Sequence, residues 1–80
     1  MRTLREEELE AMEMVAGGFY EEGGSYEILT NDDRSAWATL IFENGNDVAP
    51  IRELYADNKT LAYELARDFE SAFGNIVETF

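Results

Sequence analysis

The chain has 80 residues, enough for one domain with a modest core, and its 45% hydrophobic and 12% aromatic content is typical of a folding sequence. Its 18 Asp and Glu against 6 Lys and Arg give a formal net charge of -12, which excludes a basic surface for binding nucleic acid or an anionic membrane. Because the chain has no Cys and no His, it has no disulfides, no thiolate metal site and no cysteine or histidine catalyst.

The first predicted element is an amphipathic helix over residues 3–16. Thr3 and Glu6 have the T-x-x-E spacing of a capping box, in which each side chain satisfies a backbone donor of the other residue. Apolar residues between Leu4 and Val15 recur with a helical period, and glutamates form a row along one edge. Gly17 then stands where a left-handed glycine ends many helices.

A β-hairpin is predicted next, with strands over residues 25–30 and 35–43. Both segments are rich in β-branched and aromatic residues, and residues 31–34 between them have the polar composition of a turn. The second strand is apolar on both faces, which favours a central position in a sheet. Residues 48–55 are predicted as a third strand, and Pro50 places it at an edge because proline cannot donate a backbone hydrogen bond.

The last predicted elements are a helix capped by Asp57 or Asn58 and a short closing strand over residues 76–80. The apolar positions that define this helix recur every fourth residue: Leu61, Leu65, Phe69 and Phe73. We therefore expect one domain over residues 1–80 of the α+β class, in which a small antiparallel sheet, made of the hairpin and one or two short strands, packs against an N-terminal and a C-terminal helix.

No residue pattern predicts catalysis, a metal site or a cofactor. The adjacent carboxylates Glu21-Glu22 and Asp32-Asp33 fall in predicted turns, where solvation leaves them without the raised pKa of a general acid. Asp32 and Glu43 have the separation of the first and last ligands of an EF-hand loop, but the positions between them lack the required oxygen ligands and glycine. We expect a protein that is not an enzyme, with no metal and no cofactor.

The double glycine at Gly17-Gly18 has two interpretations. Residues 1–4, 8–9 and 15–18 resemble the double-glycine leader of small bacteriocins and microcins, although the slots that the family fills with an apolar residue and a glutamate hold Met12 and Ala11 here. This resemblance covers less than a quarter of the chain and implies export with cleavage after Gly18. The other interpretation is that Gly17 ends a helix.

A different resemblance concerns the whole surface. In size, acidity, lack of Cys and lack of a catalytic signature, the chain is similar to phage-encoded DNA mimics, including anti-CRISPR and antirestriction inhibitors. The resemblance implies a protein that blocks the Arg and Lys groove of a nucleic-acid-binding partner, such as a Cas protein, in the cytoplasm of a bacterial host. It implies no direct contact with nucleic acid or membrane, and the chain would act as a monomer or homodimer.

The expected partner-binding residues are acidic side chains with aromatic anchors among them. They are Glu6, Glu7, Glu10, Glu13, Glu21, Glu22, Asp32, Asp33, Phe19, Tyr20 and Tyr26. The remaining alternative is an acidic adaptor or subunit that binds through an apolar surface and mimics nothing.

Overall fold

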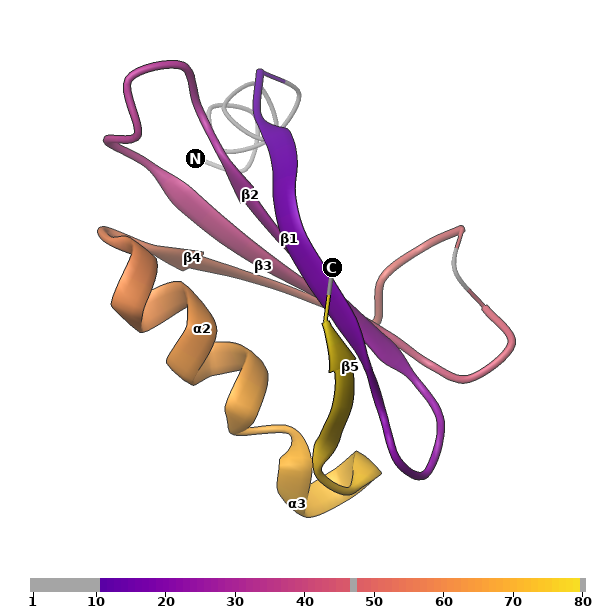
Figure 1. Ribbon diagram of the computed structural model, residues 1–80. Coiled ribbons are helices and arrows are strands. Elements are labelled where there is room, and N and C mark those ends of the chain that lie inside the picture. Colours follow the sequence, from indigo (N-terminus) through magenta and orange to yellow (C-terminus); the bar gives the residue numbers. More distant parts are fainter. Residues whose placement is uncertain (1–10, 47, 80) are drawn as a thin grey trace.

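The fold is a five-stranded antiparallel sheet with one face covered by helix, in a computed structural model that describes residues 11–46 and 48–79 (Figure 1). The spatial order is β4-β3-β2-β1-β5. The strands are β1 (Glu13–Tyr20), β2 (Ser25–Thr30), β3 (Trp37–Phe42), β4 (Arg52–Ala56) and β5 (Ile76–Thr79), and the helices are α2 (Lys59–Arg67) and α3 (Glu70–Phe73). The predicted α+β class and small antiparallel sheet are confirmed.

The predicted N-terminal helix is wrong over residues 11–16, and residues 3–10 lie outside the described part. Glu13–Tyr20 is a strand that pairs with β2 on one side and β5 on the other. Its backbone groups are thus satisfied by two neighbouring strands, and this tertiary pairing outweighs the helical period of the apolar residues. Gly17 and Gly18 neither end a helix nor lie in a loop, because they face Glu27 and Tyr26 across the ladder with β2.

The predicted hairpin is confirmed as β2 and β3. All six residues of β3 are buried, as expected for a central strand. The turn is held by the side-chain oxygen of Asn31, which accepts hydrogen bonds from the backbone N–H of Ser35 at 2.9 Å and of Ala36 at 3.2 Å. Such bonds are the reason that Asn favours turns.

The C-terminal half also follows the sequence pattern, with three differences. β4 lies at the sheet edge as predicted, but it begins at Arg52 and not at residue 48, so Pro50 precedes the strand. Asn58 caps α2 by accepting a hydrogen bond from the backbone N–H of Leu61 at 2.8 Å, and β5 is the closing strand. The helical segment is not continuous, because α2 ends at Arg67 and the short α3 follows. Leu61, predicted to face the core, is 37% exposed.

Two buried hydroxyl groups attach the sheet to α2. The Thr39 hydroxyl on β3 donates a hydrogen bond to the carbonyl of Ala62 at 2.7 Å, and the Tyr20 hydroxyl on β1 donates to the carbonyl of Ala66 at 2.5 Å. Ala62 and Ala66 lie one helical turn apart and are fully buried, so their small side chains let the helix approach the strands closely. These contacts fix both the position and the rotation of α2 on the sheet.

Alkaline pH is expected to weaken the fold partly through Tyr20. Burial, followed by the electrostatic effects of Tyr26 and Glu70, raises the pKa of Tyr20 above its ordinary value. The unfolded chain therefore loses this proton near pH 10, while the folded chain keeps it. As a result, the contribution of Tyr20 to the free energy of unfolding is fully present below about pH 10 and falls by about 1.4 kcal/mol per pH unit above it. We expect the Tyr20→Phe variant to be about 1 kcal/mol less stable than the wild type at neutral pH, and this deficit to shrink above about pH 10.

Thr39→Val provides the matched control, since it removes the other buried hydroxyl without removing a titratable group. Its deficit should stay constant when urea unfolding is measured from neutral to alkaline pH. A Tyr20→Phe deficit that is equally constant would contradict the prediction.

Candidate partner-binding surface

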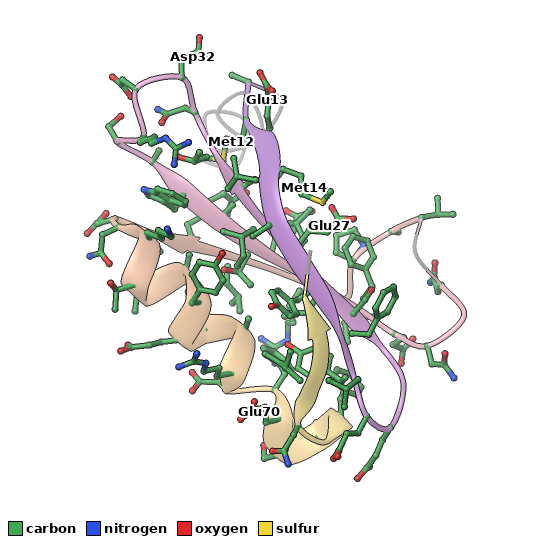
Figure 2. All side chains as sticks on the ribbon, in the orientation of Figure 1. Met12, Glu13, Met14, Glu27, Asp32 and Glu70 are labelled. Atoms are coloured by element: carbon green, nitrogen blue, oxygen red, sulfur yellow. The ribbon has the colours of Figure 1, made fainter. Side chains whose placement is uncertain are left out.

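The predicted acidic residues are divided between the two ends of β1. Glu13 is the first residue of β1 and pairs with Thr30, the last residue of β2. Asp32 and Asp33 follow in the β2–β3 turn, and Figure 2 shows the labelled Glu13 and Asp32 at the same end of the sheet. Glu21 and Glu22 lie in the β1–β2 turn at the other end. An eight-residue strand separates the two groups by about 24 Å. Among the described residues, the predicted acidic side chains therefore lie at two ends of the sheet and do not form one continuous patch.

Tyr20 and Tyr26, expected as surface anchors, lie in the core instead. They are 3% and 1% exposed, and their ring centroids are 5.8 Å apart on the face that α2 covers. Because side chains alternate along a strand, Phe19 projects from the opposite face, where it is 46% exposed. Phe19 is thus the aromatic of this group that a partner can reach. Three further predicted residues, Glu6, Glu7 and Glu10, lie outside the described residues.

The β2–β3 end combines carboxylates with a cation. The Asp33 carboxylate accepts hydrogen bonds from the Ser35 hydroxyl at 2.6 Å and the Ser35 backbone N–H at 3.2 Å, which hold the pKa of Asp33 below its usual range. The Arg34 guanidinium lies 6.0 Å from the centre of the Trp37 ring. Arg34 also lines a concavity of about 170 Å³ together with Glu13, so positive charge is already present among the acids here.

The β1–β2 end brings together two turns that are distant in sequence. A side-chain carbon added at Gly23, in the β1–β2 turn, would lie 2.8 Å from the Cβ of Asn44, in the turn after β3, so the two turns lie side by side. Together they present three exposed carboxylates. We name these residues the turn cluster: Glu21, Glu22 and Glu43.

Backbone donors hold two of the carboxylates at this end, those of Glu21 and Glu70. One Glu21 oxygen accepts a hydrogen bond from the backbone N–H of Asn75 at 3.2 Å, and one Glu70 oxygen accepts from the next residue, Ile76, at 3.4 Å. The positive φ of 84° at Gly74 permits the turn that leads into these two donors. Glu70, labelled in Figure 2, thus belongs to the same end of the sheet.

Sequence reasoning did not select Glu43 or Glu70. Their placement depends on the pairing of β2 with β3 and on the return of the chain from α3 to β5, which no local pattern encodes. The available signal is the polar composition of residues 43–47, which is typical of a turn.

Three concavities on the described surface differ in their charged residues. The first adjoins the turn cluster and measures about 220 Å³, the second is the concavity with Arg34, and the third, of about 530 Å³, contains Arg67 and Glu70 beneath α2. The first, named the Phe19 pocket, is lined by Phe19, Gly24, Ser25, Glu43, Asn44, Gly45 and Asn46. Its lining includes a carboxylate but no basic side chain, which distinguishes it from the other two.

Within residues 11–46 and 48–79, no three acidic side chains gather as a metal site, and no helix is long and apolar enough to cross a membrane. Comparison of the chain with models of known families, with curated proteins and with solved structures finds no match.

Proposed function

We propose that this protein binds and inhibits a basic, nucleic-acid-handling partner, such as a CRISPR effector in the cytoplasm of a bacterial host, by presenting carboxylates in place of phosphates. The observation that carries the proposal is the turn cluster. Its three carboxylates come from two adjacent turns, and Glu21 is held by a backbone N–H donor. A carboxylate that is already fixed loses little conformational entropy when an arginine or lysine binds it.

The spacing of the acidic ends also supports mimicry. One strand of nucleic acid places a phosphate about every 3.4 Å along the duplex axis, so the roughly 24 Å between the ends of β1 corresponds to about seven phosphates. Arginine forms the same bidentate pairs with carboxylate and phosphate. A groove that follows a nucleic-acid strand would therefore meet carboxylates at both ends of this sheet.

The proposal is tested by competition with DNA. Fluorescently labelled target DNA is bound to purified CRISPR effector complexes, and the full chain is titrated in at low and at high NaCl. We expect displacement of the DNA at low salt and much weaker displacement at high salt, because exposed charge pairs are screened. Displacement from none of the effector complexes would overturn the assignment to this partner class.

Salt dependence separates mimicry from the adaptor alternative. An adaptor that binds through apolar residues keeps its affinity at high salt, since burial of apolar surface does not depend on screening. Binding that survives high salt would therefore favour an adaptor over a phosphate mimic.

A further inference from the structure

We propose that the Phe19 pocket binds one arginine side chain of the partner. This inference rests on the proposed function and names the group that the acidic surface anchors. The pocket lies beside the turn cluster, because the turn that forms its wall, residues 43–46, touches the β1–β2 turn at Gly23.

The pocket is shaped by tight backbone turns. The backbone N–H of Asn46 donates a hydrogen bond to the carbonyl of Glu43 at 3.1 Å, and Gly45 has a positive φ of 82° between them. The Asn46 side chain also accepts a hydrogen bond from the backbone N–H of Val48 at 3.3 Å. At Gly24 a side-chain carbon would lie 2.9 Å from the carbonyl of Phe42, so glycine at this position keeps the lining compact.

The chemistry of the lining suits a cation with several donors. Among the lining residues, Glu43 carries a carboxylate, Asn44 an amide, Ser25 a hydroxyl and Phe19 an aromatic ring. A guanidinium has five N–H donors in a planar fork, pairs with carboxylates through two bonds and stacks on aromatic rings. Lysine offers the charge without the plane, so the pocket favours arginine.

Among the three concavities, size and charge favour this occupant and this site. The volume of about 220 Å³ is smaller than the roughly 300–1,000 Å³ typical of clefts for drug-sized ligands, so a single side chain is the better fit. The other two concavities hold Arg34 and Arg67 beside their carboxylates, so an incoming cation would compete there with a guanidinium that is already present. Within the protein itself, the guanidinium of Arg52 lies 6.0 Å from the ring centre of Phe69, the same pairing that we propose for Phe19.

The test is a titration of the full, isotope-labelled chain with blocked arginine, N-acetyl-arginine methylamide, followed by NMR. The corresponding citrulline compound serves as the neutral analogue of the same shape, and the lysine compound as the non-planar cation. We expect saturable shifts of the Ser25 and Gly45 amide signals with arginine, and affinity about tenfold weaker with citrulline. Equal affinity for arginine and citrulline would overturn the proposal.

Variants locate the site. Glu43→Gln should weaken arginine binding about tenfold, whereas Glu64→Gln, an equal change of charge on the exposed face of α2, should leave it unchanged. Phe19→Leu should remove the preference for arginine over lysine. Equal losses of arginine affinity in Glu43→Gln and Glu64→Gln would show that overall charge governs binding and would overturn the assignment to the Phe19 pocket. Because Glu43 is exposed, unfolding of Glu43→Gln should match that of the wild type, which keeps a binding loss interpretable.

The two proposals fail separately. If blocked arginine binds at the pocket but the chain displaces DNA from no effector, the arginine site is supported and the proposed inhibitor function is overturned. If the chain and its Glu43→Gln variant displace DNA equally well, and blocked arginine does not shift the Ser25 or Gly45 amide signals, the proposed function is supported and the arginine site is overturned.

Discussion

Replacing the three glutamates of the turn cluster with glutamine is expected to reduce the displacement of DNA from the partner by about 100-fold. Each charge-assisted contact that one of these carboxylates makes with an arginine or lysine contributes on the order of 1 kcal/mol, and three such contacts together give about this factor. Glutamine keeps the shape of the side chain and its hydrogen-bond acceptor, so the loss reports charge. The measurement is the DNA competition titration with the variant Glu21→Gln, Glu22→Gln, Glu43→Gln.

A second triple variant with the same change in net charge controls for the overall field. Asp57→Asn, Glu64→Gln and Asp68→Asn remove three exposed carboxylates from α2 and its flanks, where Lys59 and Arg67 also lie. We expect this variant to displace DNA within about fivefold of the wild type, because only the long-range steering term changes. Equal losses in the two triple variants would mean that net charge, and not the turn cluster, governs binding.

Removal of residues 1–18 is expected to abolish folding of the remainder, Phe19 to Phe80. The deletion takes six of the eight residues of β1, which pair with β2 over most of its length and with β5 at Gly18. Core residues of β2 such as Ile28, fully buried in the intact chain, would lose their neighbouring strand. A small domain has only about 5–15 kcal/mol of stability, less than the loss of a central strand costs.

The measurement is thermal and urea unfolding of the fragment beside the full chain. We expect a cooperative transition for the full chain and none for the fragment. A cooperative transition in the fragment would contradict the prediction and would support the leader interpretation, in which the segment after Gly18 is the mature protein. Cleavage after Gly18 in the folded chain is disfavoured, because that glycine is buried between two strands.

The elements that the sequence predicts correctly are those with local causes. The hairpin follows from β-branched strands around a turn that Asn31 closes, and α2 follows from the cap at Asn58. The first half of β1, up to Ala16, is predicted as helix because its apolar residues recur with a helical period, although its main partner β2 follows directly after the turn at residues 21–24. Gly18 pairs with Tyr26 but also with Thr79 at the far end of the chain, and a helical period of apolar residues carries no trace of such a pairing.

The candidate surface was predictable to the same limited extent. The polar turn composition around Glu21 and Glu22 predicts that both are exposed, and both are exposed in the structure. The burial of Tyr20 follows from strand alternation relative to Phe19, which a helical assignment of the preceding residues obscured. The neighbourhood of Gly23 and Asn44 depends on strand register and could not be obtained from local sequence.

The pairing of β5 with β1 determines when folding can be completed during protein synthesis. Gly18 emerges from the ribosome well before Thr79, its partner in the ladder, and the 61 residues from Phe19 to Thr79 take roughly 3–12 seconds to translate at about 5–20 residues per second. During this interval the β5-facing edge of β1 lacks the strand that covers it in the finished sheet. Nascent chains with an uncovered strand edge are prone to pair with one another or to engage chaperones, so the yield of this protein should depend on how quickly its last strand arrives.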